Sequence, residues 1–164
     1  MNELRDNSEV GELIQYIVIK IDDEQYGINI KFIDNIVRMQ QITRVPKVDD
    51  YLKGVINIRG EIVPVMSVRM KMGLAEDEIT NKSRIIILKT DSGDLVGIIV
   101  DQVNQVLTLD SNNVEKMRYD EKGKKSNASF VSGVGHYDGG LVSILDLDAV
   151  VSEKETKEAA ANAS

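Results

Sequence analysis

The sequence of 164 residues contains no cysteine and no tryptophan, and it has only two phenylalanines and one histidine. Without cysteine, the chain can form neither disulfides nor thiolate metal sites. Aromatic residues make up 4% of the chain, so its core must be aliphatic and it has few rings for stacking nucleic-acid bases. A basic surplus is also missing. The net charge of −7 argues against a nucleic-acid backbone or an anionic membrane surface as partner.

Long apolar runs are missing as well. No run approaches the length that a transmembrane helix needs, and the first residues lack the apolar centre of a signal peptide. We therefore expect a cytoplasmic protein with no direct membrane insertion. The polar residues 1–12 are expected to form a flexible N-terminal tail, and residues 152–164 a C-terminal tail that is part helical or disordered.

Hydrophobic residues nevertheless make up 42% of the chain, which is enough for a core. They are rich in isoleucine and valine, which favours strands. The alternation from Leu13 to Ile21 predicts a first strand, whereas the spacing in Phe32–Met39 fits either a helix or a strand. Residues 49–53 are expected to form one helical turn capped by Asp49, and the charged stretch 117–129 an exposed loop.

The stretch from Gly54 to Gly73, GVINIRGEIVPVMSVRMKMG, predicts a β-hairpin followed by a short helix. Its two apolar runs are separated by Arg59-Gly60, and a glycine supplies the positive φ that a tight hairpin corner requires. Ser67 fits the N-cap of the short helix. The corner therefore presents the guanidinium of Arg59 outward on a rigid tip, although the side chain could simply pair with Glu61 or another surface acid.

The second half of the chain repeats the first. Residues 54–68, GVINIRGEIVPVMSV, align without a gap on residues 133–147, GVGHYDGGLVSILDL. Asp138-Gly139 is a strong hairpin signal at the position of Arg59-Gly60, and Asp146 replaces Ser67 as a helix cap. An earlier echo, YGINI against VGIIV, extends the repeat towards the N-terminus and makes Ile33 equivalent to Val103.

These observations predict an all-β fold, mainly strands with short helices. Each copy is too small to form a stable domain alone. Each offers about five short strands, which suits a small barrel. We expect one domain at 13–151 containing two barrel subdomains, at about 16–73 and 84–151, joined by a hydrophobic seam and ending in a short helix.

Nothing in the sequence resembles a catalytic site. His136 lies in a strand beside a hairpin, where we expect a surface or half-buried residue. The glycines around it lack the lysine and helix of a phosphate loop, and the acidic pairs fit turns and caps better than a metal site. The sequence therefore predicts a binding module rather than an enzyme, with no cofactor and no metal.

The stretch GVINIRGEIVPVMSVR closely resembles the signature of the CheW-like domain family, the coupling proteins of bacterial chemotaxis. The signature runs Gly-Val-x-Asn-Leu-Arg-Gly, then an apolar run with Pro-Val, then Asp-Leu-Arg. The resemblance covers nearly the whole chain, and the matching residues are Gly54, Val55, Asn57, Arg59, Gly60, Pro64, Val65 and Arg69.

The resemblance implies two intertwined five-stranded barrels of SH3-like type and a non-catalytic adaptor that couples chemoreceptors to the chemotaxis histidine kinase. The receptor's cytoplasmic tip would dock between the barrels, and the kinase's regulatory domain, which has the same fold, would bind barrel to barrel on a surface left unassigned. The chain would lie at receptor arrays on the inner face of the membrane. The implied receptor-binding residues are Arg59, Gly60, Ile33, Asn35 and Val103.

Two departures from the family pattern bear on this assignment. Asn35 stands where the family carries glutamate, so an ion pair there would be absent or made by Asp34. Ser67-Val68-Arg69 replaces Asp-Leu-Arg, but serine keeps the capping role. Ile33 and Val103 fit a core role as well as an interface role. A nucleic-acid-binding small barrel is the alternative function, opposed by the acidic charge and the few aromatics.

Overall fold

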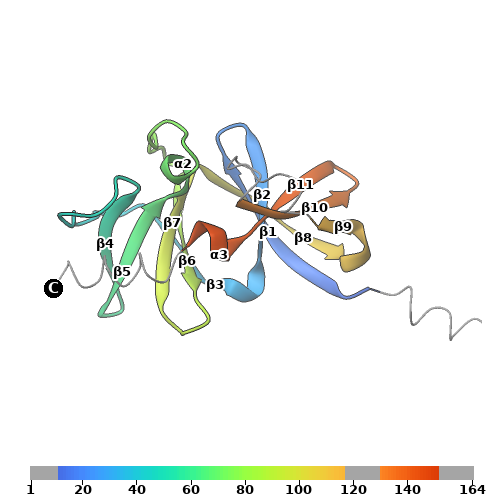
Figure 1. The fold of residues 1–164 in the computed structure, drawn as a ribbon, viewed down its shortest axis with the longest axis horizontal. Helices are drawn as coiled ribbons and strands as arrows, with labels where there is room; N and C mark the ends of the chain where they lie inside the picture. The colour runs from blue at the N-terminus through green and yellow to red at the C-terminus, as the bar shows by residue number, and fades with distance from the viewer. Residues whose placement is uncertain (1–10, 117–129, 152–164) are drawn as a thin grey trace, which may run out of the picture.

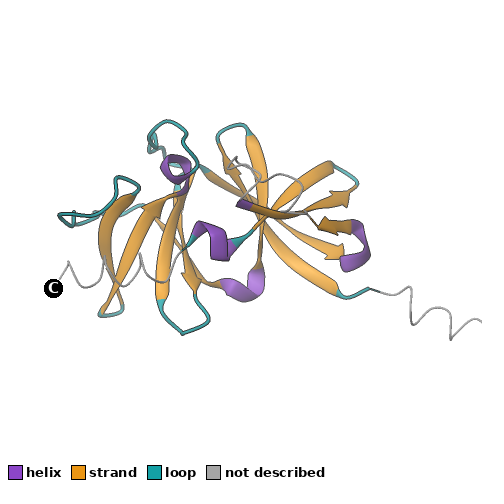
Figure 2. Cartoon of the chain, viewed as in Figure 1, coloured by secondary structure: helices purple, strands orange, loops and turns teal. Residues whose placement is uncertain are grey.

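The structure is a computed structural model that describes residues 11–116 and 130–151. Figure 1 shows two lobes side by side, each formed by one β-sheet, with short helices where the lobes meet. Among the described residues, no helix is long and apolar enough to cross a membrane. The mainly-β fold with a few short helices that the sequence predicts is confirmed, as Figure 2 also shows.

Sheet A contains six strands in the order β8-β1-β2-β11-β10-β9, and sheet B contains five in the order β3-β6-β7-β5-β4. The strands of sheet A are β1 Leu13–Ile21, β2 Glu24–Asn29, β8 Gln102–Asp110, β9 Val114–Lys116, β10 Val131–Tyr137 and β11 Gly140–Leu145. Those of sheet B are β3 Ile33–Arg38, β4 Leu52–Ile58, β5 Glu61–Ser67, β6 Arg84–Lys89 and β7 Leu95–Val100. The short helices are η1 Ile30–Phe32, α2 Val68–Lys71, η2 Ser111–Asn113 and α3 Leu147–Val150.

The two copies of the repeat exchange their first hairpins. The hairpin β1–β2 joins the later strands in sheet A, whereas β6–β7 joins β3, β4 and β5 in sheet B. Two equivalent parallel pairings make this exchange: Gly27 of β2 lies opposite Ile144 of β11, and Gly97 of β7 lies opposite Val65 of β5. The expectation that 16–73 and 84–151 each form one barrel is therefore wrong, because each sheet contains strands from both segments.

Each sheet is closed by a crossing segment at an equivalent position. In sheet B, Thr43 and Val55 exchange two backbone hydrogen bonds of 2.9 and 2.8 Å, which join the chain beyond β3 to β4. In sheet A, η2 separates β9 from β8, and β9 pairs with β10 there. This break explains why sheet A counts six strands where five were expected.

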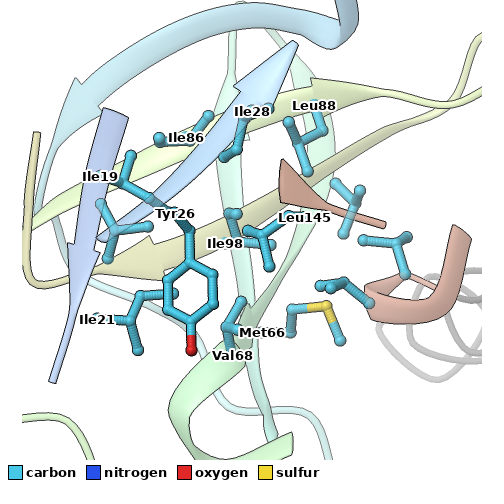
Figure 3. Packing of buried hydrophobic residues seen from close by; sticks show 14 of the residues in the cluster. Ile19, Ile21, Tyr26, Ile28, Met66, Val68, Ile86, Leu88, Ile98 and Leu145 are labelled. Atoms are coloured by element: carbon cyan, nitrogen blue, oxygen red, sulfur yellow. The ribbon is translucent and has the colours of Figure 1, made fainter. Parts of the chain in front are cut away.

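The core is mainly aliphatic, with Tyr26 as a buried aromatic member, and it is continuous between the sheets. One cluster takes residues from both, including Ile19 and Ile28 of sheet A and Met66 and Ile98 of sheet B (Figure 3). This cluster is the predicted hydrophobic seam. Beyond the seam, each barrel has its own smaller cluster.

Two local predictions are resolved differently. Residues 49–51 form a turn and β4 already begins at Leu52, so the helical turn expected at 49–53 is absent. Within 32–39, η1 ends at Phe32 and β3 follows, so the ambiguous stretch is mainly a strand. The expected loop at 117–129 and the tail at 152–164 lie outside the described residues, as does the N-terminal tail up to residue 10.

Candidate functional site

The β4–β5 hairpin carries the first candidate residues at its corner. Arg59 and Gly60 have φ angles of 52° and 83°, the pair of positive values that a type I′ turn requires. The side chain of Asn57 accepts a hydrogen bond of 2.9 Å from the backbone N–H of Gly60, which braces the corner. The motif Asn-x-Arg-Gly therefore builds a rigid tip.

The guanidinium of Arg59 is presented to solvent, with 66% of its side chain exposed. Its Nη2 donates to Oδ2 of Asp34 at 3.1 Å. Because β3 and β4 are the two edges of sheet B, this ion pair spans the closure of the barrel. An exposed pair of this kind contributes only about 0–1 kcal/mol to stability, so its main effect is to orient the guanidinium.

A β-bulge explains why Asp34 makes this contact. Ile33 pairs with Leu88 and Asn35 with Ile87, which leaves Asp34 without a partner in the register. A bulged residue is turned away from its regular direction. The ion pair is thus made by Asp34, the alternative that the departure at Asn35 left open, and the Asn35 side chain accepts from the Ile36 N–H at 2.8 Å.

The structure brings Arg59, Gly60 and the start of β3 together. Val103 lies on β8 in sheet A. Ile33 and Val103 are both partly buried, and both pack against the cluster that joins the sheets. They therefore lie at the rim of the seam, where each side chain is partly in the core and partly accessible to a partner.

Sequence reasoning missed a polar network around Arg69. Only 14% of this side chain is exposed, and it lies 2.9 Å from a carboxylate oxygen of Asp101 and 3.4 Å from one of Asp22. Its Nε also donates to the carbonyl of Ala75 at 3.0 Å. Asp22 is in the β1–β2 turn and Asp101 lies between β7 and β8, so Arg69 fastens α2 to segments of both sheets. The family's Asp-Leu-Arg motif was the signal that marked this residue.

The cap of α2 belongs to a second buried polar group. The Ser67 hydroxyl accepts from the Met70 N–H at 3.1 Å and donates to a carboxylate oxygen of Asp77. The other carboxylate oxygen of Asp77 is buried without a hydrogen-bond partner. Burial raises the pKa of Asp77 above its usual 3.8, and the Ser67 hydrogen bond opposes that shift only in part.

Other titratable groups in the described part of the chain offer no reactive arrangement. His136 lies on β10 with half of its side chain exposed and contacts the Glu115 carboxylate at 2.8 Å. No group of three metal-ligating side chains occurs in residues 11–116 and 130–151. Fold and site together define a two-barrel binding module whose polar features fix its shape and present a guanidinium.

Comparison with known proteins identifies the family. The profile of the CheW-like domain matches residues 15–155, and the chain belongs to this family. It is 34% identical to the chemotaxis protein CheW of Bacillus subtilis, over 87% of this chain and 90% of that protein. It is 33% identical to the CheW of Thermotoga maritima, over 96% and 99% of the two chains.

The fold is likewise that of a solved relative. The crystal structure of the scaffolding protein TtCheW from Thermoanaerobacter tengcongensis matches with a TM-score of 0.78 and 29% identity, over 88% of this chain and 97% of that one. The chain is thus a scaffold or adaptor of chemotaxis signalling, and nothing in the comparisons favours the nucleic-acid alternative.

Proposed function

We propose that this protein couples chemoreceptors to the chemotaxis histidine kinase without catalysing a reaction. The receptor's cytoplasmic tip binds at the Arg59 hairpin and the adjacent rim of the seam. The regulatory domain of the kinase binds elsewhere on the barrels. The protein acts in the cytoplasm, held at receptor arrays through protein contacts alone.

The observation that carries this proposal is the presentation of Arg59. A long cationic side chain normally loses much rotamer freedom on binding, and that loss weakens affinity. Here the hairpin backbone is fixed by Asn57, and the guanidinium is oriented by Asp34 while two thirds of the side chain stays exposed. Arginine held in this way is a typical anchor of protein interfaces.

The apolar part of the surface comes from the seam. Ile33 and Val103 each leave part of their side chain accessible beside the common core. Interfaces commonly place such aliphatic area at the centre and charged groups at the edge. We propose that both residues contact the receptor tip, with Gly60 and Asn35 beside Arg59 at the edge.

Arg59→Ala tests this assignment. We expect it to weaken binding of a purified receptor cytoplasmic fragment by about tenfold or more, or about 1.4 kcal/mol, while unfolding free energy falls by less than about 1 kcal/mol. Arg44→Ala, which removes another exposed arginine, is the matched control and should bind normally. Undiminished binding by folded Arg59→Ala would show that the receptor does not bind at this hairpin.

A further inference from the structure

Because of the repeat, the seam has two equivalent ends, but different residues occupy them. At one end, Arg69 of α2 pairs with Asp22 and Asp101, and the segment that follows α2 adds Leu74 to the core. The alignment of the copies puts Asp148 of α3 at the position of Arg69, and the β6–β7 turn with Asp91 at that of the β1–β2 turn. The first end, which we call the fastened end, is therefore held together by Arg69 of the same chain. The second end has an aspartate at the equivalent position.

The second end is a cleft of about 290 Å³ between η1, the β6–β7 hairpin and α3. Its floor is apolar and includes Leu88, Val96 and Leu145, which the repeat makes equivalent to Ile19, Tyr26 and Met66 at the fastened end. All six side chains belong to the core cluster that joins the two sheets. The cleft thus opens directly onto the seam.

The rim of the cleft carries surplus negative charge. Of the described residues, three acids line it, Asp91, Asp146 and Asp148, together with one lysine, Lys89. Asp146 caps α3 by accepting from the N–H groups of residues 148 and 149. Asp91 and Asp148 make no ion pair with any other described residue. Among the described residues, no cation pairs with Asp91 or Asp148 in the way that Arg69 pairs with Asp22 at the fastened end.

We propose that this cleft binds a segment of a partner protein that inserts an aliphatic side chain and places an arginine or lysine against Asp91 and Asp148. The fastened end shows which chemistry the geometry accepts, since Leu74 and Arg69 supply an aliphatic side chain and a guanidinium there. None of the residues assigned to the receptor surface is among the described residues that line this cleft. The inference therefore concerns other residues and stands without that assignment.

Titration of the ¹⁵N-labelled full-length protein with two matched peptides, followed by NMR, tests the proposal. Acetyl-Leu-Leu-Arg-amide should shift the backbone amides of Leu88, Val96 and Leu147, whereas acetyl-Leu-Leu-Glu-amide should not. The double change Asp91→Asn and Asp148→Asn should weaken the arginine peptide by about two- to fivefold, the range that partly exposed ion pairs span. Asp50→Asn, an exposed acid outside this cleft, should leave its affinity unchanged.

Three outcomes would overturn the proposal. The first is equal binding of both peptides, since the cleft would then select no cation. The second is the absence of shifts around the cleft at about 10 mM peptide, which would leave no useful affinity for such a segment. The third is concentration-dependent broadening of the cleft amides without peptide, which would assign the surface to a second copy of the chain.

Discussion

Two non-glycine residues that adopt the left-handed backbone conformation also form ion pairs between separate segments of the fold. Asp22 has a φ of 59° and pairs with Arg69, and Arg59 has a φ of 52° and pairs with Asp34. A residue with a Cβ pays about 1 kcal/mol or more for this conformation. In both cases the turn directs a charged side chain at a partner on another segment, which glycine could not do.

Exchanging Arg59 for glycine or alanine separates backbone strain from binding. Both variants lose the ion pair, but only alanine keeps the penalty of a positive φ, so Arg59→Gly should be about 0.5–1 kcal/mol more stable than Arg59→Ala. Both should lose receptor binding to the same degree. Urea unfolding measures the difference, and an alanine variant as stable as the glycine variant would show that the corner has relaxed to another conformation.

Asp77 should make stability depend on pH. Its pKa in the folded state is raised above 3.8 by burial, so the native state binds the proton more tightly than the unfolded state. The buried carboxylate therefore destabilises the fold at neutral pH, and this cost is relieved as pH falls through the raised pKa. Asp101 adds to the shift and Arg69 opposes it.

Asp77→Asn isolates this effect from the other carboxylates. The unfolding free energy of the variant minus that of the natural protein should be most positive at pH 7 and should decrease as pH falls towards 3.8. Urea unfolding at a series of pH values measures it. A difference that grows on acidification would mean that the carboxylate is stabilised in the fold, contrary to its burial.

At the scale of elements, closure of the barrels depends on two glycines. A Cβ on Gly54, whose φ is 144°, would lie 2.1 Å from the carbonyl oxygen of Thr43, and one on Gly133 would lie 2.7 Å from that of Glu115. These are the crossing segments of the two sheets. Gly54 and Gly133, which begin the two aligned segments 54–68 and 133–147, thus allow the backbones to approach closely.

Gly54→Ala should therefore cost about 2 kcal/mol or more in unfolding free energy, because a backbone atom must move. Gly60→Ala is the control. Its φ is also positive, at 83°, but open space surrounds the added carbon, so about 1 kcal/mol is expected. Urea unfolding of the two variants ranks them, and an equal cost would show that the crossing can be relaxed without strain.

The sequence predicts elements better than their partners. Both hairpin corners and both helix caps follow from local signals at Arg59-Gly60, Asp138-Gly139, Ser67 and Asp146, and all four are observed. The exchange of first hairpins could not be read in this way. It depends on parallel pairings between distant segments. The strands would bury their apolar residues whether each hairpin stayed with its own copy or joined the other, so the apolar pattern does not distinguish the two arrangements.

The site could be predicted only in part for the same reason. Arg59 stands out because its hairpin is local. Its partner Asp34 depends on a bulge and on barrel closure, which bring residues from opposite edges of the sheet together. The cluster of Asp22, Arg69 and Asp101 joins three separated segments, and the motif that marks Arg69 does not show which acids it meets.

At the scale of the whole molecule, Arg69 joins segments of both sheets through Asp22 and Asp101. Arg69→Met should cost about 1–3 kcal/mol, because it leaves Asp22 and Asp101 close together without their cation. Arg69→Lys should restore part of this stability. Hydrogen exchange of the Asp22 amide, which donates to Asp101 at 2.8 Å, should accelerate in the methionine variant. Unchanged exchange would show that other contacts fix the turn.

A mixture of this protein, a receptor cytoplasmic fragment and the kinase regulatory domain, separated by size-exclusion chromatography with mass determination, tests the central claim most directly. The account predicts a three-part complex with the natural chain and a complex with the kinase domain alone for Arg59→Ala. Failure of the natural chain to join the two partners, or an intact three-part complex with Arg59→Ala, would contradict it.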